Sequence, residues 1–418
     1  MIFSQNDTKG EIFMEKILLG LLAFVLALVV IFGGIALVNK QNAKEMAAYI
    51  DEFKVQAVEP ALHPDLDEHG NYYFVTDEDF KVLHLTDIHL SGGFLQKETD
   101  KKTINAVAAM VSAEKPDLVI VTGDIAYAIG IGGTINNAYA HNMFIRLMEN
   151  LGVYWTVAFG NHDTEPYNYH KRDAVANMYA DQDLERCLFG HSPDGVSGEG
   201  NHVINVKNTK GEITKSLFMF DSHSYIRQDL VGGLIDSLMW NYDVIKQDQV
   251  DWYEDMIELY SPKSSLAFFH IPLYEMKEGY DEYIANGRTD TDNVKWMDGR
   301  DGEEGDVVVY ASESEVGDQL FEKALELGNT KAFFFGHDHF NNFVMDYKGI
   351  IFSYGFSIDY IAYGDIGNKG YQRGCTVLTL TPDGEFGAEN IVHENYYQDK
   401  YQPLYEKEVV DMYPYFDK

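Results

Sequence analysis

Cysteine is scarce in this sequence, with Cys187 and Cys375 the only two among 418 residues. So few cysteines exclude a disulfide-dense scaffold and any zinc ribbon built from CxxC pairs. Three catalytic motifs are also missing from the sequence: the GxSxG turn of serine hydrolases, the HExxH of zinc proteases and the GxxxxGK[ST] loop of nucleoside triphosphatases. The sequence therefore disfavours these three classes of enzyme.

Basic residues are few relative to acidic ones. The chain has 32 Lys and Arg against 67 Asp and Glu, a formal net charge of -35. A surface this acidic repels nucleic acid backbones, so we expect no long nucleic acid as a partner. A small anionic substrate is still compatible with this charge if the pocket that binds it is positively charged. The hydrophobic content of 45% and the length predict a globular protein with a sizeable core.

One segment near the N-terminus carries no charge. Residues 17–38, ILLGLLAFVLALVVIFGGIALV, are long enough to cross a bilayer as a helix. The run is longer than the apolar core of about 7–15 residues in a cleavable signal peptide. We therefore predict an uncleaved single-pass anchor, with a cleaved signal as the alternative. Lysines flank both sides and give no orientation, while the acidic bulk after the run favours an extracytoplasmic location.

The sequence predicts five segments. They are an N-terminal flank (1–16), a transmembrane anchor (17–38), a stalk or linker (39–72), a main domain (73–395) and a C-terminal tail (396–418). In the main domain, short apolar strands alternate with amphipathic helices, which is typical of an α/β fold with both faces of the sheet covered. Residues 278–306 are acidic, contain glycine and lack a clear period, so they are predicted to be a loop insertion.

Polar side chains follow five of the predicted strands. In chain order they are Asp87 and His89; Asp124; Asn161, His162 and Asp163; His270; and His337 and His339. In open α/β sheets, ligands bind beyond the carboxyl ends of the strands, so these groups can converge on one crevice. Each group alone is more often a turn or a hydrogen-bonded loop residue. Burying the whole set unpaired would be costly, and a pair of divalent cations would remove that cost. Mixed oxygen and imidazole ligands suit zinc, manganese or iron.

The pattern D-x-H, GD, GNHD, H, GHxH resembles the calcineurin-like metallophosphoesterase superfamily over residues 80–381. The segments KPDLVIVTGD, FGNHD, FFHIP and FFFGHDH are similar to the branch that includes purple-acid-phosphatase-like proteins. The resemblance implies a four-layer α/β/β/α sandwich with two central mixed sheets, and two divalent metal ions (Mn, Zn or Fe). The implied ligands are Asp87, His89 and His339 for one ion, Asn161, His270 and His337 for the other, and Asp124 as the bridge.

The resemblance also implies roles in catalysis for two neighbouring residues. His162 would donate a proton or stabilise the transition state, and Asp163 would orient it. The predicted function is a membrane-anchored phosphoesterase that attacks a phosphorylated small molecule, most simply a monoester, with a hydroxide activated by two metals. The alternatives are a phosphodiesterase or nuclease on the same site, and a non-catalytic anchored binding module.

One residue of the pattern needs separate comment. Tyr127, in GDIAY, is placed like the tyrosine ligand of true purple acid phosphatases, which lack the histidine of D-x-H. Here His89 is present, so we expect Tyr127 to pack behind the ligands and predict no purple ferric centre. His223 is a candidate for the substrate pocket, although a hydrogen-bonded loop residue is the simpler interpretation. His84 is predicted to be a core histidine.

Overall fold

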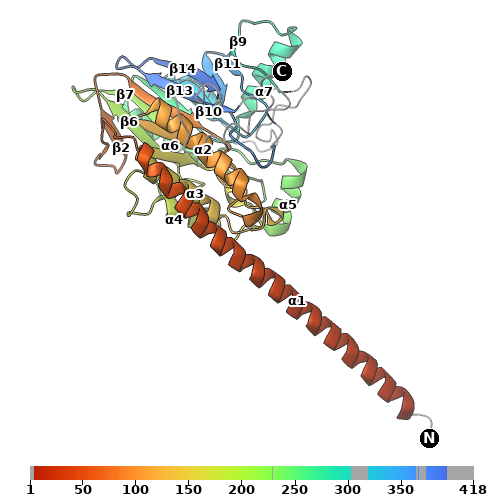
Figure 1. The fold of residues 1–418 in the computed structure, drawn as a ribbon. Coiled ribbons are helices and arrows are strands. Elements are labelled where there is room, and N and C mark those ends of the chain that lie inside the picture. The colour runs from red at the N-terminus through yellow and green to blue at the C-terminus, as the bar shows by residue number, and fades with distance from the viewer. Residues whose placement is uncertain (1–3, 228, 303–318, 364–365, 367–372, 393–418) are drawn as a thin grey trace, which may run out of the picture.

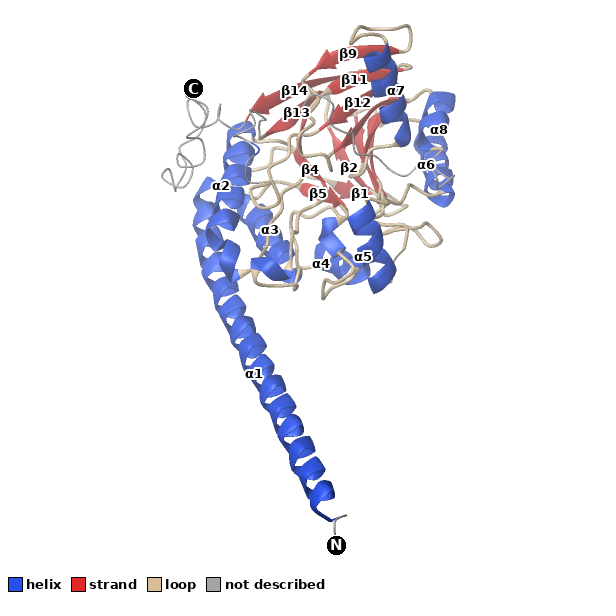
Figure 2. Ribbon diagram, turned by 90° about the vertical axis from the view of Figure 1, so that its right-hand side faces the viewer, coloured by secondary structure: helices blue, strands red, loops and turns tan. Residues whose placement is uncertain are grey.

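In the described part of the chain, two β-sheets lie face to face and helices cover their outer faces (Figures 1 and 2). This computed structural model describes residues 4–227, 229–302, 319–363, 366 and 373–392. The inner faces of the two sheets share one core cluster, to which Val82 and Ile120 come from one sheet and Leu217 and Phe268 from the other. The four-layer α/β/β/α sandwich predicted from the sequence is confirmed.

The larger sheet has nine strands among the described residues, in the order β1-β2-β6-β7-β8-β10-β12-β11-β9. Their bounds are β1 (Asp65–Leu66), β2 (Tyr72–Val75), β6 (His202–Lys207), β7 (Ile213–Met219), β8 (Ser264–Phe268), β9 (Val294–Asp298), β10 (Thr330–Phe335), β11 (Val344–Tyr347) and β12 (Ile350–Tyr354). Strands β7, β8, β10 and β12 are parallel neighbours. Their carboxyl ends therefore meet at one edge of the sheet.

The smaller sheet has five strands within the described ranges, in the order β14-β13-β3-β4-β5. Their bounds are β3 (Phe80–Leu85), β4 (Leu118–Thr122), β5 (Trp155–Ala158), β13 (Gly374–Leu380) and β14 (Phe386–Val392). Strands β3, β4 and β5 are parallel. In β4, Leu118 and Ile120 enter the core between the sheets, while Val119 and Val121 enter the core under the helices. A strand buried on both faces needs such a continuous apolar run.

Helices form the two outer layers. Their bounds are α1 (Ser4–Asp51), α2 (Lys97–Glu114), α3 (Ala138–Leu151), α4 (Arg172–Tyr179), α5 (Leu230–Met239), α6 (Gln247–Tyr260), α7 (Tyr274–Ala285) and α8 (Leu320–Leu327), with short 3-10 turns η1 (Glu52–Gln56), η2 (Phe94–Gln96), η3 (Gly130–Gly132) and η4 (His162–Thr164). The last turns of α1, together with α2, α3 and α4, pack on the smaller sheet. Helices α6, α7 and α8 pack on the larger sheet.

Helix α1 is a single long helix that projects from the body (Figure 1). Its apolar part is exposed and is long and apolar enough to cross a bilayer, a criterion that a signal sequence also meets. The last turns of α1 behave differently, because Met46 and Ile50 are fully buried in the core. We predicted a stalk over residues 39–72, but the structure places its first part inside the body, since an apolar face appears on the helix after Val38.

The predicted loop insertion at 278–306 is wrong for much of its length. Helix α7 runs to Ala285 and strand β9 covers Val294–Asp298. Trp296 of β9 stacks on Phe343 with ring centroids 4.7 Å apart, and Tyr280 of α7 packs on the same ring, so long-range aromatic packing supplies the order that the local pattern lacks. Residues 303–306 and the predicted tail at 396–418 lie outside the described residues.

Candidate metal centre

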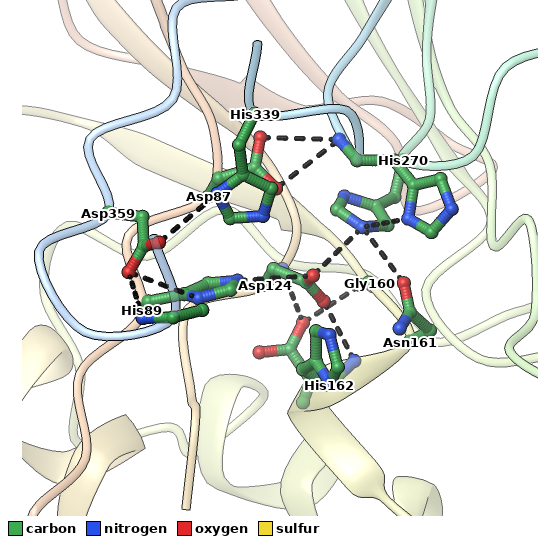
Figure 3. Close-up of polar contacts among 12 residues, drawn as sticks. Asp87, His89, Asp124, Gly160, Asn161, His162, His270, His339 and Asp359 are labelled. Carbon is green, nitrogen blue, oxygen red and sulfur yellow. Dashed lines mark hydrogen bonds and ion pairs between the residues drawn. The ribbon is translucent and has the colours of Figure 1, made fainter. Parts of the chain in front are cut away.

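The polar groups that follow the five strands converge at one place, beyond the ends of strands from both sheets (Figure 3). The loops after β3, β4 and β5 of the smaller sheet carry Asp87, His89, Asp124 and Asn161, and those after β8 and β10 of the larger sheet carry His270, His337 and His339. All seven side chains are buried. The structure therefore brings the seven predicted ligands together, although the coordination assigned to each remains a prediction.

Asp124 lies at the centre of the cluster. Its Oδ2 atom is 3.3 Å from Nε2 of His89 on one side and 3.1 Å from Nε2 of His270 on the other. On the first side, possible ligand atoms of Asp87, His89, Asp124 and His339 lie within 4.8 Å of one another, and on the second side the same holds for Asp124, His270 and His337. Asp124 thus belongs to both groups.

Asn161 joins the second group through its amide oxygen. Its Oδ1 atom lies 3.2 Å from Nε2 of His270. His337 is on the same side, with Nδ1 3.3 Å from that nitrogen, and its Nε2 has no hydrogen-bond partner among the residues that the structure describes. A buried nitrogen without a partner is costly, and a cation would satisfy it. The donor set fits two divalent ions bound through imidazole and oxygen ligands.

The backbone at these positions is held in an uncommon conformation. Asp87, His89, Asp124 and His337 all have positive φ, between 51° and 77°. Such values are unfavourable for residues with a side chain and occur where the surrounding structure imposes them, often at functional sites. The approach of the two sheets is also tight, since a Cβ on Gly336 would lie 1.8 Å from Oγ1 of Thr86. Glycine is therefore required just before His337.

Hydrogen bonds behind the cluster turn the imidazole rings toward its centre. Nδ1–H of His270 donates to the carbonyl oxygen of Thr122 over 2.7 Å, which leaves Nε2 facing Asp124. A carboxylate that the sequence analysis missed, Asp359, lies 3.3 Å from Nδ1 of His89 and 3.2 Å from Nδ1 of His339. Partners of this kind fix the tautomer and orientation of histidine ligands.

The carboxylates also control the charge of the buried histidines. Burial by itself lowers the pKa of His89, but the charges of Asp359 and Asp124 outweigh it and raise that pKa to about 10. For His270, burial is likewise outweighed by Asp124, and the pKa rises to about 9. The centre therefore favours positive charge at its middle, which is the charge that metal ions carry.

His162 stands next to the cluster in η4. Its backbone N–H donates to Oδ1 of Asp124 over 2.8 Å, and its Nδ1 lies 2.6 Å from Oε1 of Glu165. Burial opposes the charged form of His162, but Asp124 and Glu165 favour it more strongly, so its pKa is raised. A quarter of the side chain is exposed, which gives it access to a substrate.

The structure corrects the expectation that Asp163 orients His162. The carboxylate of Asp163 accepts hydrogen bonds from the backbone N–H groups of Asp124, Ala126 and Gly160, over 2.8 to 3.1 Å. It thus holds the loops after β4 and β5 together, because an aspartate this short reaches the neighbouring backbone more easily than the next side chain. The contact with the imidazole comes from Glu165, which the sequence analysis missed although the i, i+3 spacing in a turn could have indicated it.

Aromatic rings line the centre. Tyr127 stacks on His89 with ring centroids 4.8 Å apart, in line with the expected packing role, and burial raises its pKa to about 12. The hydroxyl of Tyr225 donates to Oε1 of Glu165 over 3.0 Å. Tyr242 packs edge-on against His337 with centroids 4.3 Å apart. The sequence analysis did not find Tyr225 or Tyr242.

Two other histidines that were singled out lie away from the cluster. His84 is buried in the core, as expected, with Nε2 2.8 Å from Oγ1 of Thr122. His223 lines a cavity of about 460 Å³ that Tyr225 and Arg172 also line, and its Nε2 lies 3.0 Å from Oε1 of Gln249. Whether His223 meets a substrate therefore stays a prediction.

Comparisons with known proteins identify a family and several proteins that this chain resembles. The family described as calcineurin-like phosphoesterase matches residues 80–341. The chain is 26% identical over 355 residues to a probable inactive purple acid phosphatase 14 of Arabidopsis thaliana, covering 76% of this chain and 80% of the relative. It is 28% identical over 224 residues to phosphatase DCR2 of Saccharomyces cerevisiae, covering 48% of this chain and 36% of that protein. A dimetal phosphatase structure from Danio rerio aligns with a TM-score of 0.45 at 11% identity, covering 76% of this chain and 97% of that one.

Proposed function

This chain belongs to the calcineurin-like phosphoesterase family, and from that premise we propose that it is a membrane-anchored, dinuclear metal phosphomonoesterase. In this proposal Asp87, His89 and His339 would hold one divalent ion, Asn161, His270 and His337 would hold the other, and Asp124 would contribute to both. The substrate is a phosphorylated small molecule. The position of Asp124 Oδ2, close to one histidine of each group, is the observation that carries the proposal.

The proposed chemistry divides between the ions and the chain. When bound, two divalent cations supply charge neutralisation for the phosphate and activation of a water nucleophile. His162 transfers a proton to the oxygen of the leaving alcohol, a general-acid role worth about 10²–10⁴-fold in rate. Glu165 accepts the Nδ1–H of His162 over 2.6 Å, so that the proton to be transferred sits on Nε2. Asn161 contributes a neutral oxygen, which leaves more net positive charge for the phosphate than a carboxylate would.

The proposed anchoring rests on α1. Its exposed apolar part is about as long as the hydrocarbon core of a bilayer, roughly 30 Å. The acidic body that follows favours an extracytoplasmic location. In this proposal the catalytic domain begins within the predicted stalk, because the last turns of α1 are part of the core.

Hydrolysis by the full chain in detergent tests the proposal. The protein is stripped of metal with a chelator, reloaded with Mn²⁺, Zn²⁺ or Fe²⁺, and assayed with an aryl phosphate monoester and the matching diester. We expect metal-dependent turnover that is faster with the monoester, absent in Asp124→Asn and unchanged in Asp292→Asn, a control on an exposed loop.

The other results each point elsewhere. Faster turnover of the diester would favour the phosphodiesterase alternative. Two bound ions without turnover of either ester would favour the binding module. A chain that binds no metal after reloading would overturn the proposal altogether.

A further inference from the structure

Helix α5 turns its large apolar residues away from the body. Its buried residues are the small or polar Gly232, Gly233 and Asp236. Its outward residues, together with the residue that ends it, are between 44% and 82% exposed: Leu230, Val231, Ile235, Leu238, Met239 and Trp240. A surface helix of a soluble protein has the opposite arrangement, with its apolar stripe toward the core. A cluster of exposed apolar residues of this size marks an interaction surface.

Several specific contacts fix α5 in this orientation. Asp229 caps the helix by accepting the N–H groups of Val231 and Gly232, over 3.1 and 2.9 Å. The guanidinium of Arg227 binds the buried carboxylate of Asp236, with Nε 2.9 Å from Oδ2. A Cβ on Gly233 would lie 2.6 Å from Cγ of Pro166, so glycine allows this close packing. The outward face of α5 is therefore held in place by the fold.

Three more exposed residues connect α5 with the point where α1 leaves the body. We call Leu95, Ile135 and Tyr169 the apolar rim. Leu95 follows Phe94, whose N–H donates to Oδ1 of Asn39 in α1 over 3.0 Å. The carbonyl of Ile135 accepts the N–H of Tyr169 over 3.0 Å, and Tyr169 lies three residues after Pro166, the partner of α5. The rim thus runs from α1 toward α5.

The direction of α1 places a bilayer on this side of the protein. Asn39 is buried against the body, whereas the apolar residues before it are exposed. Because α1 is one helix through this point, a bilayer crossed by residues 17–38, about 33 Å long at 1.5 Å per residue, begins where the body ends. Figures 1 and 2 both show α5 at the end of the body from which α1 departs.

We propose that the outward face of α5 and the apolar rim enter the interfacial region of the bilayer that α1 crosses. The inference rests on the proposed anchoring of the chain. Apolar side chains with a tryptophan and a tyrosine at the edge suit this region of a membrane. Because the chain has a net charge of -35, the partner is a zwitterionic lipid surface, which the acidic body does not repel.

This contact would reach the candidate metal centre through one short segment. Tyr225 and Tyr242 form an antiparallel bridge that closes the segment 225–242 at its base. Helix α5 lies within this segment, at the end far from the bridge. At the base of this segment, the ring of Tyr242 packs on His337 and the hydroxyl of Tyr225 donates to Glu165. One wall of the metal centre and the proposed membrane contact are therefore parts of the same hairpin-like segment.

Quenching of Trp240 by brominated lipid tests the inference in the full chain. The protein is reconstituted into phosphatidylcholine nanodiscs whose acyl chains either carry bromine or do not, and the fluorescence of wild type and Trp240→Phe is compared. Trp155 and Trp252 are buried, and Trp296 lies on β9 at the far end of the body, so the difference reports Trp240. We expect brominated lipid to quench the signal that Trp240→Phe removes, and Trp296→Phe to leave the quenching unchanged.

Three other results would overturn the inference. Trp240 could be quenched by aqueous acrylamide and not by brominated lipid, which would place the face in water. It could be protected from both quenchers, which would mean that a second copy or another protein covers it. Chains that do not co-purify with the discs would overturn the anchoring as well. None of these results depends on hydrolysis, so they are separate from a failure of the proposed enzymatic function.

A matched pair of variants checks the same surface by another route. Leu238 is 82% exposed on α5, and Leu259 is 45% exposed on α6. We expect Leu238→Asp to weaken the quenching of Trp240 by brominated lipid and Leu259→Asp to leave it as in wild type. Both variants should hydrolyse a water-soluble aryl ester at the wild-type rate. Equal quenching in the two variants would contradict the proposed contact.

Discussion

Two pairs of buried histidines in this protein differ in the direction in which their pKa is shifted. In the metal centre, the pKa of His89 is raised to about 10 and that of His270 to about 9. In the core, burial lowers the pKa of His84 to about 3 and that of His202 to about 4. Burial disfavours the charged imidazole in all four, so the difference arises from their neighbours.

The neighbours of the core pair are neutral. Nδ1–H of His202 donates to the carbonyl oxygen of Gly200 over 2.8 Å, and Nε2 accepts from Oγ1 of Thr156 over 2.7 Å. The neighbours of the site pair are the carboxylates of Asp124 and Asp359. A buried histidine is therefore informative about function when buried anions surround it, because those anions require a positive charge that metal ions can provide.

Replacing Asp124 should have the largest effect on the difference in pKa between the site histidines and the core histidines. In Asp124→Asn, a carboxylate that lies close to both His89 and His270 is lost, and we expect neither metal ion to be retained. Turnover should fall by at least about 10²–10³-fold, the scale seen when one main electrostatic stabiliser is removed. Elemental analysis after gel filtration measures the metal content. Retention of two ions per chain would contradict the assignment of Asp124 as the bridge.

Replacing His162 should distinguish proton transfer at the site from metal binding. We expect His162→Gln to lower kcat by about 10²–10⁴-fold, because the proton donor is lost, while the metal content stays unchanged. His191→Gln is a matched control, since His191 is exposed and pairs with Glu199. A variant that loses metal in proportion to its activity would contradict the role of His162 as proton donor. An ester with a good leaving group needs no proton, so equal slowing of esters with good and poor leaving groups would contradict it too.

Replacing Asp359 should affect only one of the two proposed metal sites. Its carboxylate orients His89 and His339, so Asp359→Asn should weaken binding of the first ion by about 10–100-fold and leave the second ion nearly unaffected. Titration calorimetry of the metal-free protein gives both affinities, with Asp292→Asn as the control. Equal weakening at both ions would mean that Asp359 acts on the whole centre.

The core pair gives the smallest effect, on stability. Because the pKa of His202 is lowered in the folded chain, an unfolded chain takes up a proton below pH 6.5 that the folded chain refuses. Stability should therefore fall as the pH drops from about 6.5 to about 4, by about 3 kcal/mol from this group. Urea unfolding of wild type and His202→Gln over this range measures the effect. An equally steep acid dependence in the variant would exclude His202 as its source.

The sequence predicts the residues of the candidate metal centre better than the groups behind them. Asp87, Asp124 and His270 each lie two residues after the end of an apolar strand, so a local pattern places them at the edge of a sheet. Asp359 follows β12 only after several residues, and it reaches His89 because Ser357 forms a parallel bridge with Thr86 just after β3, which no local pattern reveals. Glu165 likewise depends on how one turn folds.

The helical layers show the same limit. The apolar residues of α1 predict a helix, but only packing shows that Met46 and Ile50 belong to the core. Helix α5 is also misleading, because an apolar segment predicts burial and the structure turns it outward. In both cases the deciding factor is which neighbour covers the helix, and that is a property of the whole fold.

The unbroken course of α1 has a consequence for how the protein meets its substrate. In an anchored chain, the buried turns of α1 that contain Met46 and Ile50 fix the distance between the metal centre and the lipid surface. A substrate that shares the membrane plane is then found by lateral diffusion in two dimensions, at a high effective concentration. A substrate in free solution gains no such advantage.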